Sequence, residues 1–427
     1  MALNREILRI ALPSILSNIT VPLLGLADVA LTGHLGAVAY LGAIAVGGML
    51  FNVIYWMFSF LRMGTSGHTA QAFGRNDPRD IMTGLGRSVT AALGISALLL
   101  LFRHPVGWLA LHLIRPSDAV ASLALLYYDI CIWGAPAALL LFAVTGWYIG
   151  MQNARIPMWV AIVQNVVNIS LSVFFVFVLG MKLEGVALGT VLAQYVGLAV
   201  ALAFWWARYR HLRGELVWRD ISDIGGMLRF FRTNKDLFLR TLCLIAIHFF
   251  FISAGAGFGD TALAVNTMLM QFFMLYSYIM DGFAFAGEAI VGRAVGACDK
   301  VLYRSTVRRL FIWGACMVCL FTAVYALAGP RFLFFLSDDA GVVSAAMAYQ
   351  PWTLLIPLCS VATFVWDGVF IGELNTRGML LAMASGLVAF FALYAWWAPL
   401  YGNHGLWAAF LSYLAVRGLT QTVYKFL

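Results

Sequence analysis

A single carboxylate lies inside a long apolar stretch near the start of the chain. Asp28 stands in "PLLGLADVALTGHLG", residues 22–36, and the apolar sequence begins near Ile7. A charge at mid-bilayer costs about 2.5 to 3.5 kcal/mol on insertion scales, so an acidic residue inside a membrane helix usually has a function. Desolvation disfavours the ionised form of a carboxyl group, which lets a buried one bind and release protons near neutral pH. The alternative is that Asp28 lies at the mouth of an external loop.

Amide and hydroxyl side chains further along the chain could gather around this carboxylate. They are Gln164, Asn165, Asn168, Ser172, Thr190 and Gln194. Asn168 and Ser172 are four residues apart and share one helix face. Single amides in membrane helices often serve only to join helices, so a structural role stays open for each. Pro13 interrupts the backbone hydrogen bonds of the first helix, which can therefore bend on the N-terminal side of Asp28.

Three more acidic residues and one basic residue lie within or near other apolar stretches. The acidic residues are Asp281, Glu288 and Asp367, and the basic residue is Arg62 in "FLRMGTSG". Asp281 and Glu288 are seven residues apart, so we expect them on one face of a helix that borders an aqueous cavity. Arg62 is interpreted as the only basic residue deep in a span. Its partner would be an acidic residue or helix-end carbonyls, and a structural ion pair fits its position as well as a substrate contact.

The composition indicates which elements must position these side chains. Of the 427 residues, 63% are hydrophobic and 11% are charged, with a mean hydropathy of +0.89, which is typical of an integral membrane protein. Apolar runs of about 18 or more residues recur, each long enough to cross the roughly 30 Å hydrocarbon layer as a helix. Twelve spans are predicted, near residues 7–32, 40–72, 88–111, 121–150, 157–179, 184–207, 237–257, 261–292, 306–328, 344–372, 378–398 and 404–424.

Basic residues gather in alternate connections between these spans. The only long polar connection, between spans six and seven, holds Arg208, Arg210, Arg213, Arg219, Arg229, Arg232 and Lys235. Positively charged loops stay on the cytoplasmic side, so both termini and this connector are predicted to be cytoplasmic in a multi-pass protein of the cell's inner (plasma) membrane. Topology and anionic membrane lipid then explain the net charge of +8, and no nucleic-acid partner is expected.

An internal repeat divides the chain. When the sequence is shifted by 222 residues, "GWYIGMQNAR" (146–155) aligns with "GVFIGELNTR" (368–377), and Asp77 aligns with Asp299. The sequence therefore predicts an N-lobe at 1–207, a cytoplasmic linker at 208–236 and a C-lobe at 237–427. Each lobe holds six spans, an even number, so both enter the membrane in the same orientation. The predicted fold is an all-α membrane protein with twelve helices in two six-helix lobes, related by a pseudo-two-fold axis along the membrane normal.

These stretches resemble the multidrug and toxic compound extrusion (MATE) family, specifically its DNA-damage-inducible F (DinF) branch. The matching stretches are "LADVALTGHLG", "FLRMGTSGHTAQAFGRND", "GWYIGMQNARIP", "DGFAFAGEAIVGRAVGA" and "WDGVFIGELNTRG". The resemblance implies a central cleft between the lobes and secondary active export of amphipathic, often cationic, organic compounds in exchange for H+ or Na+. Small organic cations or amphipathic drugs would be the substrates.

The resemblance also assigns roles to individual residues. Asp28 matches the branch's first-helix aspartate, which is thought to be protonated during exchange, and Pro13 matches the proline at which that helix is proposed to bend. Asn168 and Thr190 match polar residues around the aspartate. The position four after the asparagine is commonly aspartate in this branch but is Ser172 here, which removes one carboxylate and favours H+ over Na+.

Rival functions are a flippase for lipid-linked oligosaccharide or lipid from the same superfamily, a membrane-embedded enzyme and a passive channel. A flippase should have a more cationic cavity, whereas Arg62 is interpreted as nearly the only basic residue within the predicted helices. No metal- or haem-ligand spacing, nucleophile motif or phosphate-binding loop is present, so no enzyme activity, metal or cofactor is expected. We expect a monomer because one chain contains both lobes. Gln164, Asn165, Gln194, Arg62 and the three acidic residues of the second half are candidates for a substrate site.

Overall fold

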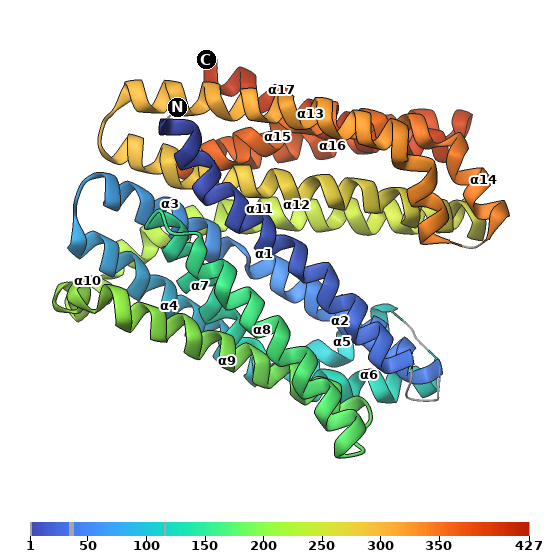
Figure 1. Ribbon diagram of the computed structural model, residues 1–427, viewed down its shortest axis with the longest axis horizontal. Coiled ribbons are helices and arrows are strands. Elements are labelled where there is room, and N and C mark those ends of the chain that lie inside the picture. Colours follow the sequence, from blue (N-terminus) through green and yellow to red (C-terminus); the bar gives the residue numbers. More distant parts are fainter. Residues whose placement is uncertain (1, 34–37, 115–116, 338, 427) are drawn as a thin grey trace. The chain divides into compact units, whose positions relative to one another are not determined.

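Helices form all of the regular structure in the described residues 2–33, 38–114, 117–337 and 339–426 of the computed structural model (Figure 1). Lipid offers no hydrogen-bond partners, and a helix satisfies its backbone groups within one segment. Eleven segments of these residues are long and apolar enough to cross a membrane. The twelfth is α17 (Asn403–Phe426), which is less apolar because it carries Asn403, Arg417 and Gln421. The predicted all-α membrane protein with two six-helix lobes is confirmed.

The contacts divide the chain into two compact units. One comprises Leu16–Phe231, and the other combines the start of α1 (Ala2–Gly33), up to Ile15, with the chain from Arg232 onward. Both divisions fall inside continuous helices, the first in α1 and the second in α11 (Ile224–Gly257). Most of the polar connector therefore groups with Leu16–Phe231. The lobe limits drawn from the repeat, 1–207 and 237–427 with a linker at 208–236, stay a prediction.

The unit Leu16–Phe231 contains the second part of α1 and the helices up to α10. Their bounds are α2 Val38–Phe58, α3 Phe60–Gly74, α4 Pro78–Leu101, α5 Arg103–Ile114, α6 Asp118–Cys131, η1 Ile132–Gly134, α7 Ala135–Gly150, α8 Arg155–Val173, η2 Phe174–Val178, α9 Leu183–Tyr209, η3 Arg210–Glu215 and α10 Trp218–Ile221. Three of the predicted spans in this unit are interrupted. The second breaks at Ser59, between α2 and α3, and the third breaks at Phe102, between α4 and α5. The fourth breaks at η1, just before Pro136 at the start of α7.

The other unit contains the long helices α12 and α13 and most of α11. After α11 come α12 Asp260–Gly296, α13 Lys300–Leu336, α14 Ala340–Ala348, α15 Gln350–Glu373, α16 Thr376–Tyr401 and α17. Its interior is rich in aromatic rings, such as Phe251, which packs edge-on against Trp407 with ring centroids 5.1 Å apart. Asn266 and Asn403 exchange two hydrogen bonds of 2.8 Å inside this interior, so both buried amides find partners.

The backbone reproduces the internal repeat at two helix crossings. A Cβ built on Gly146 would lie 2.4 Å from the carbonyl oxygen of Arg62, where α7 crosses α3. A Cβ built on Gly368 would lie 2.3 Å from the carbonyl oxygen of Ala284, where α15 crosses α12. Both the glycines and the carbonyls occupy corresponding positions of the repeat, so each unit uses a glycine at the same place to bring two helices into backbone contact.

The turns follow the same repeat. Asn76 and Cys298 have positive φ values of 53° and 55°, and Gln152 and Leu374 have values of 60° and 56°. The members of each pair correspond in the repeat, although left-handed backbone is uncommon for side chains other than glycine. The matching residues therefore occupy matching turns in the two halves of the chain.

Pro13 lies inside α1, and the helix continues through it. The division between the two compact units, at Ile15 and Leu16, follows two residues later. Ser14 Oγ donates a hydrogen bond of 2.9 Å to the carbonyl oxygen of Ile10, one of several bonds that hold this turn. The expected bending of α1 at Pro13 stays a prediction.

Candidate functional site

Helices α8 and α9 bring three of the predicted coupling residues together. Asn168 Nδ2 donates a hydrogen bond of 3.2 Å to Thr190 Oγ1, and Ser172 Oγ lies 3.5 Å from Asn168 Oδ1. Asn168 and Ser172 are buried. A Cβ on Gly189 would lie 2.5 Å from Ser172 Oγ, so the glycine of α9 leaves room for this hydroxyl. We refer to Asn168, Ser172 and Thr190 as the α8–α9 polar cluster.

The same face of α8 reaches the first helix. Asn165 Nδ2 donates a hydrogen bond of 3.2 Å to the carbonyl oxygen of Thr20 in α1. Asn165 lies three residues before Asn168, about one helical turn earlier. The polar cluster is therefore part of a polar strip along α8 that begins at a contact with α1.

The two glutamines pack against glycines in the same unit. A Cβ on Gly197 of α9 would lie 2.8 Å from Gln164 Oε1, and one on Gly134 of η1 would lie 1.8 Å from Gln194 Oε1. Gln194 Nε2 donates a hydrogen bond of 3.4 Å to the hydroxyl of Tyr55. These glycines leave room for both amide groups where two helices pass closely. Such packing fits a structural role for the two glutamines as well as a role in substrate binding.

Asp28, the residue with which the sequence argument begins, lies in α1. Its side chain is outside the part of the chain that the structure describes. Its role as the proton-binding group stays a prediction.

Arg62, Asp281 and Glu288 are not joined into one site by the contacts described. Arg62 is half-buried in α3, where its carbonyl packs against Gly146. Asp281 is half-buried and Glu288 is buried, both in α12. The aqueous cavity expected beside these two carboxylates stays a prediction, as does a substrate contact of Arg62.

Asp367 is the centre of a buried charged cluster in the unit that contains α15. Its Oδ2 accepts a hydrogen bond of 2.5 Å from Arg240 and another from Arg417, and its Oδ1 accepts one of 2.7 Å from Gln421. Arg417 also donates to the hydroxyl of Tyr413, at 3.1 Å. With two arginines and one carboxylate, these three ionised groups carry a net charge of +1. We refer to Arg240, Asp367, Arg417 and Gln421 as the Asp367 cluster.

The interpretation of Arg62 as the only basic residue deep in a span is wrong. Arg240 and Arg417 are only 7% and 3% exposed, inside α11 and α17. Both lie within predicted spans, at 237–257 and 404–424, and that placement is the signal that identifies them from the sequence. Their counterparts in the first half of the repeat are Asn18 and Tyr195, so the repeat does not carry these charges.

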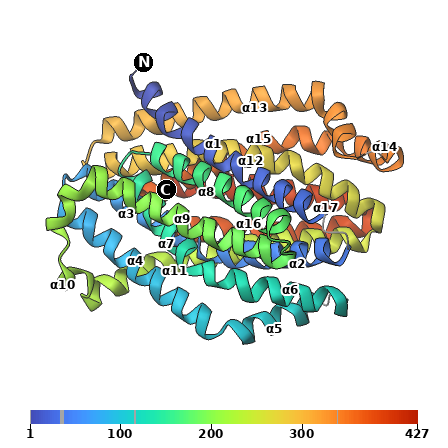
Figure 2. The ribbon, with the colours of Figure 1, turned by 60° about the horizontal axis from the view of Figure 1, so that its bottom comes forward.

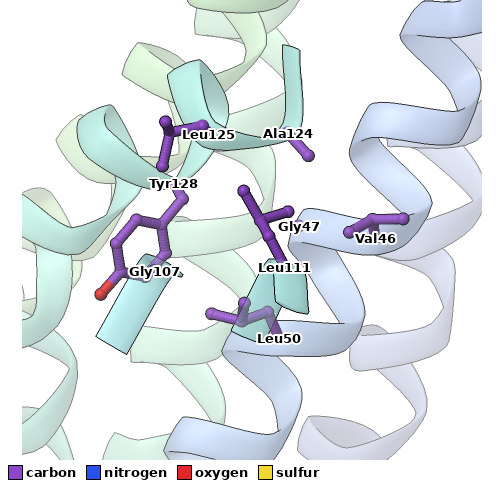
Figure 3. A pocket seen from close by; sticks show the side chains of 8 residues that line it. All are labelled: Val46, Gly47, Leu50, Gly107, Leu111, Ala124, Leu125 and Tyr128. Atoms are coloured by element: carbon purple, nitrogen blue, oxygen red, sulfur yellow. The ribbon is translucent and has the colours of Figure 1, made fainter. Parts of the chain in front are cut away.

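None of these polar residues lines the small pocket shown in Figure 3. Its volume is about 10 Å³, and it is lined by Val46, Gly47, Leu50, Gly107, Leu111, Ala124, Leu125 and Tyr128. Sites for drug-sized ligands occupy roughly 300 Å³ or more. We interpret this apolar space, between α2, α5 and α6, as a packing gap and not as a substrate site.

The sequence profile of the MatE family matches residues 13–174 and 237–397, three quarters of the chain. The chain belongs to this family. Its two matched segments fall in the two halves of the internal repeat. As a member of the multidrug and toxic compound extrusion (MATE) family, it is a multi-pass membrane transporter, and the resemblance seen in the sequence motifs is confirmed.

Curated relatives locate the chain within the MATE family. It is 37% identical over 422 residues to the DNA damage-inducible protein F of Escherichia coli strain K12, covering 98% of this chain and 91% of that protein. A probable multidrug resistance protein NorM of Bradyrhizobium diazoefficiens is 26% identical over 410 residues, covering 89% and 83%. The first similarity confirms the predicted DinF branch.

Solved MATE structures share the fold. A MATE crystal structure in the bent conformation matches with a TM-score of 0.87 and 21% identity, covering 99% of this chain and 94% of that one. An outward-facing multidrug resistance MATE transporter matches with a TM-score of 0.84 and 20% identity, with the same coverage. At these identities the likeness shows the fold alone.

Proposed function

We propose that this MATE transporter is a secondary active multidrug efflux antiporter. It exports amphipathic organic cations in exchange for H+, and Na+ is the alternative coupling ion. Protonation of Asp28 and bending of α1 at Pro13 change the exposure of the substrate site. The probable multidrug resistance proteins among its relatives support this substrate class.

The α8–α9 polar cluster is the observation that carries the proposal. Spans one and five are both odd-numbered, so α1 and α8 cross the membrane in the same direction. From the contact between Asn165 and Thr20, eight residues of α1 rise ~12 Å to Asp28, and seven residues of α8 rise ~10.5 Å to Ser172. Asp28 then lies at about the level of the polar cluster. This agreement supports Asp28 as the carboxylate that these amide and hydroxyl groups surround.

The chemistry of the cluster favours a proton as the coupling ion. Asn168, Ser172 and Thr190 are all neutral, so Asp28 would be the sole acidic group among them. A sodium ion, like other hard cations, favours several oxygen ligands that include charged ones. A lone carboxylate needs only a proton to lose its buried charge. The replacement of the branch's usual aspartate by Ser172 supports the same choice.

The driving force is sufficient for export. One proton that moves down 100 mV supplies about 2.3 kcal/mol. At one-for-one exchange this supports a substrate gradient of roughly fifty-fold. Coupling requires that proton and substrate each bind with different affinity to the two states of the transporter.

The remaining assignments belong to the same proposal. The protein acts as a transporter and not as an enzyme, with no cofactor and no nucleic-acid partner, and it works as a monomer in the inner membrane. The distribution of arginines among the connections supports cytoplasmic termini. Gln164, Asn165, Gln194, Arg62, Asp281 and Glu288 remain candidates for substrate contacts.

Transport in sealed vesicles tests this function. The purified protein is reconstituted, a pH gradient is imposed without sodium, and the movement of ethidium is followed for the wild type and Asp28→Asn. Asp118→Asn is the matched control, because it makes the same chemical change at an exposed position. We expect gradient-driven movement in the wild type and the control, and none in Asp28→Asn. Persistent transport by Asp28→Asn would show that Asp28 is structural, and transport only with sodium would identify Na+ as the coupling ion.

The alternative function, a flippase for lipid-linked oligosaccharide or lipid, makes a different demand on the charged residues. Recognition of a pyrophosphate needs cationic side chains that can reach it. Arg240 and Arg417 are buried and both bind Asp367, which favours export of organic cations. Arg62 would be the residue to test for a flippase, by measuring transfer of a fluorescent lipid pyrophosphate with Arg62→Gln.

A further inference from the structure

The polar connector packs against the N-terminal half of α4 (Figure 2). Ile221 of α10 is buried, and a Cβ on Gly86 of α4 would lie 2.4 Å from its Cδ1. Arg79 Nε donates a hydrogen bond of 2.5 Å to Asp220 Oδ2, and Arg87 donates one of 2.8 Å to the carbonyl oxygen of Asp220. The short helix α10 is therefore packed on α4.

Exposed large apolar side chains occur from the connector into the start of α11. Trp218 is 72% exposed, Ile224 is 76% exposed and Leu228 is 64% exposed, and Leu216 and Phe231 are exposed as well. Ile224, Leu228 and Phe231 follow the spacing of one helix face at the start of α11. Several exposed large apolar residues within sixteen residues of sequence are typical of an interaction surface.

Basic side chains are interleaved with these apolar ones. Arg213, Arg219 and Arg229 are exposed, and the Arg229 side chain retains 78% of its accessible surface. Arg229 lies 3.9 Å from Asp223, a contact at the limit of an ion pair. The segment also holds two acidic residues, of which Asp220 is paired with Arg79 of α4 and Asp223 lies near Arg229. Apolar side chains interleaved with basic ones are typical of helices that lie in a membrane interface.

The length of α11 locates this surface relative to the bilayer. The helix has 34 residues and spans ~51 Å, whereas the hydrocarbon layer is about 30 Å thick. Arg229, Arg232, Lys235 and Asp236 lie in its first half, before the predicted span at 237–257, so the hydrocarbon layer begins after them. Arg240 lies in the same half but is buried against Asp367. Residues 224–231 are then on the headgroup side of the hydrocarbon layer, and the close approach of Gly226 to the guanidinium of Arg87 sets them beside the first part of α4. Lipid headgroups are the partner expected at this level.

We propose that residues 216–231 form a binding surface for anionic phospholipids. Trp218, Ile224 and Leu228 insert at the boundary between headgroups and acyl chains, and Arg219 and Arg229 bind lipid phosphates. The Asp220–Arg79 pair holds the segment on α4. Lipid bound to the segment is therefore attached to the unit Leu16–Phe231. Each basic residue is expected to raise the affinity for anionic lipid about fivefold.

Depth-dependent fluorescence quenching of the full-length protein tests this surface. A bimane label is attached through Ile224→Cys or Leu228→Cys, in a background where the exposed Cys298, Cys316 and Cys319 are serine. Lys300→Cys, at an exposed polar position at the start of α13, is the matched control. Vesicles contain phosphatidylcholine alone or a 3:1 mixture with phosphatidylglycerol. Quenching by a doxyl-labelled lipid reports membrane contact, and quenching by iodide reports exposure to water.

In the mixed vesicles we expect the doxyl lipid to quench labels at 224 and 228 at least threefold more than the label at 300, with iodide showing the reverse order. The difference between mixed and neutral vesicles should fall when Arg219→Gln and Arg229→Gln are combined. Strong iodide quenching at 224 and 228 in both vesicles would overturn the proposal. Equal depth in the two vesicles would exclude selectivity for anionic lipid, and shielding from both quenchers would show that protein covers the surface. A thermal melt of each labelled variant confirms that it is folded.

Discussion

Arg240 lies 2.5 Å from the carboxylate of Asp367, and this contact joins α11 to α15 within one unit of the transporter. Arg417 of α17 binds the same carboxylate, so three helices meet at one acidic side chain. Removing one partner of a buried ion pair is costly because it leaves the other charge uncompensated. Asp367 was a candidate for a substrate or second-lobe site on sequence grounds, and its surroundings are those of a residue that holds helices together.

The Asp367 cluster predicts an order of stability among its variants. Asp367→Asn leaves two buried positive charges without a carboxylate, and we expect a loss of about 3 to 5 kcal/mol. Arg240→Gln leaves Arg417 paired with Asp367, so the loss should be smaller. Thermal unfolding in detergent measures both, with Asp260→Asn, at an exposed position, as the control. If Asp367→Asn melts no lower than Arg240→Gln, the charge balance inferred for the cluster is wrong.

The two helix crossings predict matched effects of alanine. Gly146→Ala and Gly368→Ala should each lower the free energy of unfolding by about 1 to 3 kcal/mol, because the added Cβ collides with a carbonyl oxygen. Gly94→Ala in α4 is the control, since nothing lies within 4 Å of a Cβ there. That substitution should be neutral or stabilise the helix by about 0.5 to 1 kcal/mol. Equal melting temperatures for the three variants would contradict the close crossings.

The α8–α9 polar cluster predicts a graded loss of transport. Thr190→Val keeps the shape of the side chain but removes the acceptor of the bond from Asn168, which is worth about 1 kcal/mol or about fivefold in rate. We expect the pH dependence of ethidium transport to shift as well, because the neighbours of Asp28 change. Thr267→Val, at an exposed position of α12, is the control. An unchanged pH profile in Thr190→Val would argue against a coupling role for the cluster.

The link between α10 and α4 predicts a pH dependence. The hydrogen bond from Arg79 lowers the pKa of Asp220 below its usual value. A lowered pKa means that the contact stabilises the folded connector above the ordinary carboxyl range, near pH 4, and is lost as the pH falls through the lowered value. Hydrogen exchange of the amides of residues 216–222 should stay slow from pH 7 down to about pH 4. After correction for intrinsic rates, it should rise below that range. Asp220→Asn should exchange faster than the wild type at pH 7 and approach it at low pH, where the wild-type carboxyl is protonated. Protection equal to the wild type at pH 7 would refute the role of this ion pair.

The apolar pattern was sufficient to predict most of the fold. Helices must satisfy their own backbone groups in lipid, so apolar stretches of sufficient length become membrane helices whatever their detailed sequence. The internal repeat could also be predicted from the sequence. Gly146 and Gly368 recur at equivalent positions because only a glycine lets the two helix backbones approach there. Asn168 and Thr190 were identified together from resemblance, and the structure brings them into contact.

The sequence by itself thus determined the order of the membrane-spanning segments, the internal repeat and the residues of the α8–α9 polar cluster. Only the tertiary structure decided which charges meet. Arg240, Asp367 and Arg417 are separated by 127 and 50 residues, and they come together because α11, α15 and α17 pack in one unit. Local sequence does not predict which charged residues come into contact, because the partner that compensates a buried charge is set by packing between distant helices.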